Sequence, residues 1–415
     1  MNLQIALYED ENSRLLSPLS LTRPVYDLRC GMFLLREKIQ HQLPAHDLHF
    51  LCRPYLAETF RESITSTNEK SRVNQISGDN YLLLNGRFIP ASGELEKITA
   101  VGNSGLKWSI GNTVVAARIS GSMLDGMLNA HDGVLPSSAL ADLPDAPGPL
   151  TGELITYPWH LVNANAKQIE ADFNLRGQGG KIFGKVYPNA TLLNEENIYI
   201  APGAVIKPGA VLDAESGPIY VDKKAVVMPN ATLEGPVFIG EGSTIKIGAK
   251  IYEGTSIGEV CKVGGEVEES IIHSFSNKQH EGFLGHAYLG QWVNIGADSN
   301  NSDLKNNYGN VKVFADGEWI DSGSQFVGLT MGDHAKCAIN TMFNTGTIVG
   351  IMCNVFGAGF PPKYLPSFSW GGAEDIVPYQ IDKALAVARR VMARRNKQLT
   401  PAMEAMLRHI AGAND

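Results

Sequence analysis

Cysteine is scarce in this chain and never occurs in closely spaced pairs. The 415 residues include five cysteines, which are scattered from Cys30 to Cys353. Without a C-x-x-C pair, the pattern argues against both a cysteine zinc site and a disulfide framework.

Long apolar runs are missing as well. None approaches the roughly 18 residues that a membrane-spanning helix needs, and the N-terminal MNLQIALYEDENSRLL turns acidic too early for a secretory leader. A formal net charge of −8 argues against general nucleic-acid binding, although local basic clusters can still hold the phosphates of a small ligand. We expect a cytoplasmic protein that engages neither membranes nor nucleic acids.

The sequence has a six-residue repeat in its second half. A period of six fits neither a helix of 3.6 residues per turn nor a simple alternating strand, so each hexad must be a short strand followed by a turn. Turn residues in APG, KPG, MPN and GEG mark the corners. Stacked hexads predict a left-handed parallel β-helix whose interior is filled by the recurring aliphatic residues: Val221, Val227, Leu233, Ile239, Ile245, Ile251, Ile257 and Val263, with an earlier offset set of Ile200, Ile206 and Leu212.

The repeat is interrupted twice. It breaks over 270–285, resumes at Leu289 and Ile295, and breaks again until Met331. We therefore predict two loops that leave the β-helix, 271–286 and 297–325. Loops on a rigid scaffold are a common place for chemistry.

The repeat divides the chain into three parts. Residues 1–180 mix apolar strands (QIALYED, HFLCRP, NYLLLNGRFIP, NTVVAAR) with helical segments (GMFLLREKI, GSMLDGMLNAH) and predict an α/β domain with a mostly parallel sheet. Residues 181–370 form the β-helix. Residues 371–415 are predicted to be helical, with Thr400 as an N-cap before Pro401, and to cover the open end of the β-helix.

Cationic residues follow the first predicted strand, where α/β sheets usually bind phosphates. Arg14, Arg23, Arg29 and Lys38 suit the phosphates of an NTP and a sugar phosphate. The same residues are equally compatible with solvated surface charge.

The N-terminal half resembles a known family. ALYEDENSRLLSPLSLTRPVYDLRCGMFLLREKI and YPWHLVNANAKQIEADF resemble segments of a bacterial family of sugar nucleotidyltransferases. The order of the domains is similar to that of bifunctional N-acetylglucosamine-1-phosphate uridylyltransferase/glucosamine-1-phosphate acetyltransferase. The resemblance implies Mg²⁺-dependent transfer from an NTP, UTP or dTTP, to a sugar 1-phosphate.

The family's phosphate and metal motifs are altered here. Arg23-Pro24 stands where the family has Lys-Pro, and Asn85-Gly86-Arg87 replaces the Gly-Asp whose aspartate binds magnesium, so Asn85 and Arg87 are candidate substrate-binding residues. Asp10, Asp172 and Asn165 are the substitute candidates for the metal, and each also fits a surface or capping role.

A second resemblance lies in the β-helix. SNKQHEGFLGHAYLGQWVNIGADSNNSDLK resembles the acetyltransferase segment of the same bifunctional enzymes. It implies that His280 is the general base and Asn294 an oxyanion donor. It also implies a homotrimer that binds acetyl-CoA between subunits, with Ala297, Lys305, Lys336 and the C-terminal arginines as candidate contacts.

The acyl acceptor stays open. Phe283, Asp298 and Asp303 depart from the acetyltransferase pattern, and Tyr252, Glu268 and Glu269 stand where the family has cationic phosphate ligands. His280 also fits a loop histidine that is hydrogen-bonded to the backbone.

Three alternatives remain. His273, His286 and His334 suit a three-histidine zinc site of the kind found in β-helices. The chain is also compatible with a single-activity acyltransferase that has a non-catalytic α/β domain, and with a non-enzymatic trimeric scaffold.

Overall fold

The α/β domain is built on a five-stranded sheet with strand order β4-β1-β5-β8-β7. The computed structural model describes residues 3–64, 66–70, 72–102, 104–131 and 134–413. The central strand β1 (Gln4–Tyr8) pairs in parallel with β4 (Leu48–Leu51) and β5 (Asn80–Asn85), whereas β8 (Thr113–Ser120) and β7 (Leu106–Ile110) are antiparallel. The sheet is therefore mixed rather than mostly parallel as predicted, because β8 runs antiparallel to both of its neighbours, β5 and β7.

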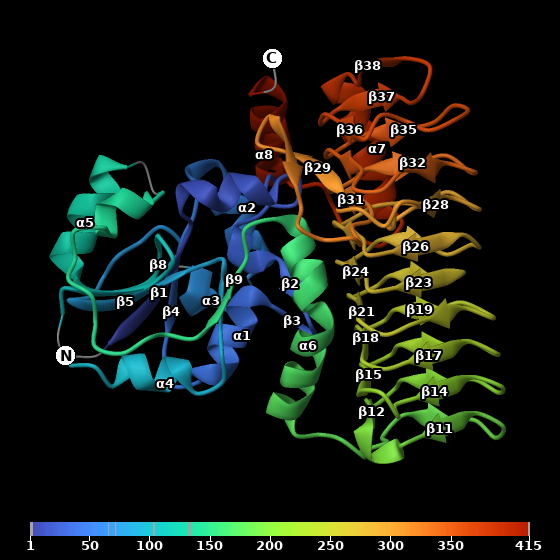
Figure 1. Ribbon diagram of the computed structural model, residues 1–415, viewed down its shortest axis with the longest axis horizontal. Helices are drawn as coiled ribbons and strands as arrows, with labels where there is room; N and C mark the ends of the chain where they lie inside the picture. Colours follow the sequence, from blue (N-terminus) through green and yellow to red (C-terminus); the bar gives the residue numbers. More distant parts are fainter. Residues whose placement is uncertain (1–2, 65, 71, 103, 132–133, 414–415) are drawn as a thin grey trace.

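Helices cover this sheet on both sides (Figure 1). Ser120 caps α5, its side chain accepting a hydrogen bond from the Met123 amide at 3.2 Å. The remaining elements of the domain are α1 (Leu35–Gln42), α2 (Ala57–Ser63), α3 (Thr67–Lys70), α4 (Glu94–Thr99), α5 (Gly121–Ala130), the strands β2 (Arg29–Cys30), β3 (Phe33–Leu34), β6 (Phe88–Pro90) and β9 (Gly152–Leu154), and the 3₁₀ turns η1 (Glu11–Leu16), η2 (Val25–Asp27), η3 (Pro54–Leu56) and η4 (Ser137–Leu140).

The longest helix, α6 (Pro158–Arg176), stands between the sheet and the β-helix. Pro158 occupies its first turn, and Gly177 ends it at φ 58°. The buried residues of α6 cover a broad face that includes the polar Asn165, Gln168 and Asp172, because this face packs against both β2 and the β-helix strands β18 and β21. The sequence carried no one-sided apolar stripe here, which is why this helix was not predicted.

The second half is a three-faced parallel β-helix, as the repeat predicts. The chain visits the first, second and third face in turn, and each strand pairs in parallel with its equivalent one coil later. The short 3₁₀ turn η5 (Glu195–Asn197) precedes β12.

The strands of the three faces are as follows. The first face holds β10 (Lys185–Val186), β13 (Val205–Ile206), β16 (Val226–Val227), β19 (Thr244–Ile245), β22 (Lys262–Val263), β25 (Asn277–Lys278), then β32 (Lys336–Cys337), β35 (Asn354–Val355), β37 (Ser369–Gly371) and β38 (Ile376–Pro378). The second holds β11 (Thr191–Leu193), β14 (Val211–Asp213), β17 (Thr232–Glu234), β20 (Lys250–Ile251), β23 (Glu266–Glu268), β26 (Phe283–Gly285), then β28 (Asn300–Asn301) and β33 (Met342–Phe343). The third holds β12 (Ile198–Ile200), β15 (Ile219–Val221), β18 (Val237–Ile239), β21 (Thr255–Ile257), β24 (Ile271–Ile272), β27 (Tyr288–Leu289), β31 (Thr330–Met331), β34 (Ile348–Val349) and β36 (Tyr364–Leu365).

The first predicted loop, 271–286, is wrong. These residues continue the coils as β24, β25 and β26. Polar side chains hid the repeat, since Lys278 takes the inward position that Val263 takes one coil earlier. Its ammonium is buried but donates to the carbonyls of Gly264 and His280, both at 2.9 Å.

The second interruption is a true excursion. The chain leaves the β-helix after Asp303 and returns at Phe326, with the antiparallel hairpin β29 (Lys312–Ala315) and β30 (Glu318–Asp321) between them.

The C-terminal helices do not cover the end of the β-helix, contrary to the prediction. Thr400 caps α8 (Pro401–Gly412) as expected, but α8 packs against α2, and α7 (Ile381–Ala393) joins the same apolar cluster. Met352 and Phe368 of the last coils belong to this cluster as well. The helices thus fill the angle between the last coils and the α/β domain, while antiparallel β38 borders the first face.

The α/β domain docks on the third face of the β-helix. Tyr199, Tyr220 and Phe238 project from successive coils and pack against Phe33 and Phe173. Aromatic side chains bury large apolar areas, so this stack holds the two halves as one body. The first and second faces remain uncovered by it (Figure 1).

The inward stacking of the aliphatic residues can be tested with two isoleucines, one in β19 and one in the turn that follows it. Ile245 is 0% exposed in the interior, and Ile247 is 60% exposed at a corner. We expect Ile245→Ala to lower the free energy of unfolding by about 2–5 kcal/mol, and Ile247→Ala to change it by less than about 0.5 kcal/mol. Urea denaturation measures both, and equal losses would contradict the inward register.

Candidate functional site

The edge of the α/β sheet at which a nucleotide would be expected is filled by buried ion pairs. Asp10 follows β1 and is 1% exposed. Arg87 donates from Nε to Asp10 Oδ1 at 2.9 Å, and Asn85 donates to Asp10 Oδ2 at 2.9 Å. A second arginine, Arg53, donates to both carboxylate oxygens of the neighbouring Glu9 at 2.9–3.1 Å.

These contacts do not fit the predicted magnesium site. Both oxygens of Asp10 already accept hydrogen bonds, and the cation that balances its charge is Arg87 rather than a metal. Asp172 is in the same position, because its oxygens accept from Lys38 at 2.6 Å and from the Met32 amide at 2.8 Å. Asn165 binds the Gly31 amide at 2.6 Å and the Gly254 carbonyl at 2.7 Å, and so joins the α/β domain to the β-helix. The geometry thus argues against Asp10 and Asp172 as metal ligands, and against Asn85, Arg87 and Lys38 as free substrate-binding groups.

The predicted phosphate-binding arginines lie at the junction of the domains. Arg23 is buried, is paired with Asp333, and donates to His273 Nε2 at 2.8 Å. Arg29 is buried too, and donates to Glu259 Oε1 at 2.6 Å. Both join the α/β domain to the β-helix, which argues against a role for either in contact with substrate. Arg14 alone is exposed, at 3.1 Å from Asp316 on the excursion.

His273 lies within this network. Burial, together with the nearby Arg23 and Arg29, holds the pKa of His273 well below its ordinary value. His273 Nδ1 faces Ser274 Oγ at 3.1 Å, so the neutral ring satisfies both partners. Docking of the two halves therefore depends on an uncharged imidazole.

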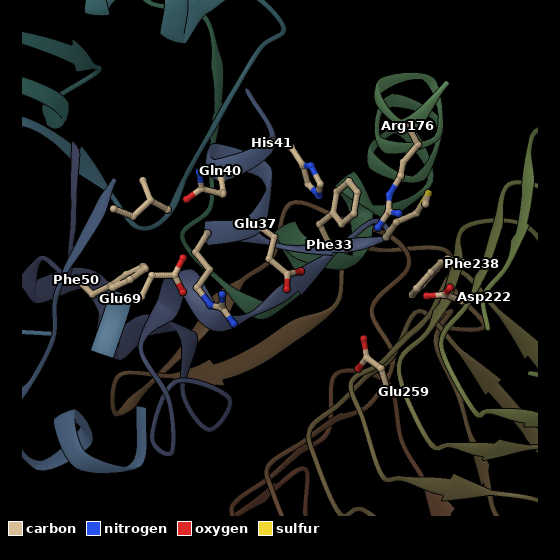
Figure 2. Close-up of a pocket in the computed structure, with 13 residues that line it drawn as sticks. Phe33, Glu37, Gln40, His41, Phe50, Glu69, Arg176, Asp222, Phe238 and Glu259 are labelled. Atoms are coloured by element: carbon tan, nitrogen blue, oxygen red, sulfur yellow. The ribbon is translucent and has the colours of Figure 1, made fainter. Parts of the chain in front are cut away.

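A cleft of about 230 Å³ opens between α1 and the third face (Figure 2). Phe33 and Phe238 lie on its opposite sides, and Arg176 lies over the Phe33 ring at 5.0 Å. Its other lining residues include Arg36, Glu37, His41, Glu69, Asp222 and Glu259. The cleft carries both aromatic and charged side chains, and none of the predicted site residues lines it.

His280 lies at the corner between the first and second faces, where its side chain is exposed. Within the described residues, no hydrogen bond of its imidazole is found, and its carbonyl accepts from Lys278. The structure therefore supplies no group that orients His280, and its role as base stays a prediction.

His286, in contrast, has a group that orients its imidazole. It lies at the corner between the second and third faces with φ 47°, and its Nδ1 is 2.9 Å from Asp303 Oδ2. The ring also stacks on Phe326, with centroids 4.9 Å apart. Asp303 and Phe326 are the two ends of the excursion, so both ends of this loop contact His286.

The His286–Asp303 pair was not predicted from the sequence, although the sequence contains a pattern that indicates it. Asp303 had been noted only as a departure from the acetyltransferase pattern. Gly285, directly before His286, allows the close approach, because a Cβ there would lie 2.4 Å from Asp303 Oδ2 and 2.5 Å from the Phe283 ring. This pattern is the Gly285-His286 dipeptide followed one coil later by Asp303.

Carboxylates surround the pair. Glu268, His286 and Asp303 bring ligand atoms within 4.8 Å of one another. Burial, and then the charge of Asp303, raise the pKa of Glu268, and burial raises that of Glu269. Acidic side chains are therefore concentrated around His286.

The three-histidine zinc alternative is wrong. His273 and His334 lie at the corner between the third and first faces, whereas His286 lies at another corner. Their imidazoles cannot converge on one ion.

The candidate acyl-donor residues lie on two different elements. Asn294 and Lys336 follow one another on the first face, where the Lys336 ammonium donates to the His334 carbonyl at 2.7 Å and burial lowers the Lys336 pKa to about 8. Ala297 lies at the next corner. Lys305 lies on the excursion, with its ammonium turned to the Asn310 carbonyl.

Residues 5–181 match the family model for sugar nucleotidyl transferases. The α/β domain is thus similar to sugar nucleotidyl transferases. This agrees with the resemblance found in the sequence, while the match stops short of the β-helix.

Curated relatives match smaller shares. Bifunctional protein GlmU from Heliobacterium modesticaldum is 29% identical over 154 residues, covering 36% of this chain and 32% of that protein. The bifunctional sugar-1-phosphate nucleotidylyltransferase/acetyltransferase from Sulfurisphaera tokodaii is 30% identical over 174 residues, covering 36% and 43%. The chain therefore spans less than half the length of these relatives.

Among solved structures, UDP-N-acetylglucosamine acyltransferase from Campylobacter jejuni matches at 12% identity with a TM-score of 0.29, covering 55% of this chain and 96% of that one. The Francisella novicida enzyme of the same name matches at 15% and 0.28, covering 54% and 74%. In the described part of the chain, no helix is both long and apolar enough to cross a bilayer.

Removing Asp10 separates a structural role from a metal-binding one. Asp10→Ala leaves the buried Arg87 unpaired, so we expect unfolding to become easier by about 3–5 kcal/mol. Chemical denaturation with and without Mg²⁺ measures this. Unchanged stability with a loss of Mg²⁺ binding would restore Asp10 as a ligand.

Acid should loosen the docked halves. A histidine whose pKa is depressed in the folded state keeps its full contribution above the unfolded pKa of about 6.5, and destabilises the fold as the pH falls below it. We expect unfolding at pH 5.0 to be easier than at pH 7.5, and less so in His273→Gln. His334, whose pKa is lowered in the same direction, remains in that variant. Equal pH dependence in the two proteins would contradict the assignment.

Proposed function

We propose that this chain is a bifunctional transferase that acts on sugars. Its α/β domain would transfer a nucleotidyl group from an NTP to a sugar 1-phosphate, and its β-helix would transfer an acyl group from acetyl-CoA to an amine. The observation that carries the proposal is the His286–Asp303 pair on a β-helix that follows a domain similar to sugar nucleotidyl transferases. The printed name of the Sulfurisphaera tokodaii relative combines the same two activities.

The acyl-transfer chemistry follows from the orientation of His286. Asp303 accepts the hydrogen bond from Nδ1–H, which leaves Nε2 to take a proton from the attacking amine. The amine nitrogen bonds to the thioester carbon, the carbon–sulfur bond breaks, and the thiolate leaves with the proton that His286 returns. Backbone N–H groups and Asn294 are the proposed oxyanion donors. His280, which lacks an orienting partner, is the second candidate for the base.

A cationic cluster supports a phosphate-bearing donor. Lys246 and Lys262 on the first face lie near Arg394 and Arg395 after α7, and Arg395 is the main cause of the lowered pKa of Lys262. Arg395 is fixed by a 2.9 Å hydrogen bond to Asn277. Within the described residues, none of the four cations is paired with a carboxylate. Crowded, unpaired cations suit the phosphates of acetyl-CoA.

The donor groups and the base lie on different faces of one prism. The column Lys262, Asn277, Asn294 and Lys336 lies on the first face, while His286 lies at the corner between the second and third. A homotrimer, in which the first face of one subunit meets that corner of the next, would bring them together. The third face is covered by the chain's own α/β domain, which leaves the other two for assembly.

The nucleotidyl transfer rests on the similarity of residues 5–181 rather than on a metal site. Asp10 and Asp172 are engaged with Arg87 and Lys38, which leaves neither carboxylate free to hold magnesium. The closed edge favours one second candidate, a single-activity acyltransferase whose α/β domain only binds a ligand. The interdomain cleft, with Arg36 and Arg176, is then the opening available for that ligand.

Two assays on the intact protein separate these functions. Pyrophosphate release is followed with UTP or dTTP and a panel of sugar 1-phosphates, and free thiol is followed with acetyl-CoA and amino sugars. Release of both products supports the bifunctional enzyme, and thiol alone supports the second candidate. Silence in both assays overturns the proposal in favour of a scaffold.

Three variants identify the base. His286→Ala should lower thiol release by about 10²–10⁴-fold, because the attacking amine loses its proton acceptor. Asp303→Asn should lower it as well, since the amide no longer stabilises the charged imidazole. His280→Ala is the matched histidine removal at the next corner and should have little effect. The opposite ranking of the two histidines would return the role to His280.

A further inference from the structure

The charges around His286 indicate which acceptor the acyl-transfer site takes. Glu268 is paired in register with Gly285, directly below the histidine. Glu269 lies at the same corner one coil down, where its amide donates to the Glu253 carbonyl at 3.0 Å. With Asp303 above, the imidazole has carboxylates in the coil below it and in the coil above it.

In the part of the chain that the structure describes, His286 is the basic side chain beside these carboxylates, and no lysine or arginine balances them. Among the described residues, Glu253, Glu268 and Glu269 make no ion pair with a lysine or arginine. The nearest basic residue on the second face, Lys250, is 3.7 Å from Glu281 at another corner. Lys305 follows Asp303 but donates to its own loop. The excess negative charge is therefore left to the solvent or to a ligand.

Aromatic rings complete the site. Phe283 lies over Gly285, and Phe326 stacks on His286. Both rings are partly exposed, Phe326 by 39%. Ring faces beside carboxylates suit a sugar, whose C–H groups pack on the rings while its polar groups meet the acids.

We propose that the acyl acceptor is an amino sugar without a phosphate on the ring that reacts. This inference rests on the proposed acyl transfer and narrows its acceptor. The substrate enters as an ammonium ion held by Glu268 and Glu269, and it loses one proton to a carboxylate or to solvent before it attacks. His286 then takes the second proton as the carbon–nitrogen bond forms. A phosphate at the same ring would face Glu268 and Asp303 with no cation to offset the repulsion.

The test compares two acceptors that differ only in the phosphate. Thiol release from acetyl-CoA is measured with glucosamine and with glucosamine 1-phosphate. We expect kcat/KM to favour the unphosphorylated sugar by at least about tenfold. Added salt should narrow the ratio, because screening weakens the repulsion.

Variants locate the preference. Glu268→Gln keeps the shape of the side chain and should raise KM for glucosamine while improving use of the 1-phosphate, so that the ratio falls. Glu241→Gln is the control, since Glu241 is exposed at another corner and pairs with Lys224 at 3.0 Å. Binding of glucosamine, followed by ligand-observed NMR, gives a readout that does not depend on turnover.

The outcomes separate failure of this inference from failure of the proposed acyl transfer. Preference for glucosamine 1-phosphate, or a ratio unchanged in Glu268→Gln, overturns this inference and leaves acyl transfer standing. Activity that requires Mg²⁺ or Mn²⁺ and is lost with EDTA also overturns it, because a cation would then occupy the carboxylates. No thiol release with any acceptor means that the proposed function itself fails.

Discussion

The docking of the α/β domain on the third face of the β-helix is the constraint on which the rest of this structure depends. It combines the aromatic stack from Tyr199 to Phe238 with two ion pairs, the buried Arg23–Asp333 and the half-buried Arg29–Glu259. Charges taken out of water are tolerable only when each has a partner, so these pairs specify one arrangement of the halves. The same docking withdraws Arg23 and Arg29 from solvent. Residues that looked suited to phosphate in the sequence thus became structural.

Charged residues at the edge of the α/β sheet are also paired with one another. The carboxyl edge of a parallel sheet is the usual place for a ligand, yet here Asp10 and Glu9 face Arg87 and Arg53. The two acids are held by arginines of the same chain. The domain is similar to sugar nucleotidyl transferases, and the charged groups at this edge of its sheet stabilise the fold. The open cleft lies elsewhere, between α1 and the β-helix.

The β-helix separates its charges by face. Cations gather where the first face meets the end of α7, and carboxylates gather around His286 at the opposite corner. The prism holds these two groups of charges apart within one chain, at the sites where we propose that donor phosphates and an ammonium acceptor bind. This separation gives the acyl-transfer proposal its physical basis.

The sequence by itself determined the β-helix, because short strands separated by turns every six residues pack as stacked coils. It also located the main excursion, although the predicted start at 297 is too early, since β28 still belongs to the second face. The sequence likewise located β1, β4, β5 and β8 of the α/β sheet, whose apolar runs are local, but not the edge strand β7, which is only partly buried. It did not reveal α6, whose buried residues face two partners. It also did not reveal the coil hidden by Lys278, whose buried ammonium depends on the Gly264 carbonyl of the neighbouring coil and the His280 carbonyl of its own coil. Only the tertiary structure decided which charged residues are free. Whether Asp10 can bind a metal depends on Arg87, and whether His286 can act as a base depends on Asp303. Such pairings are made by parts of the chain that come together only when it folds.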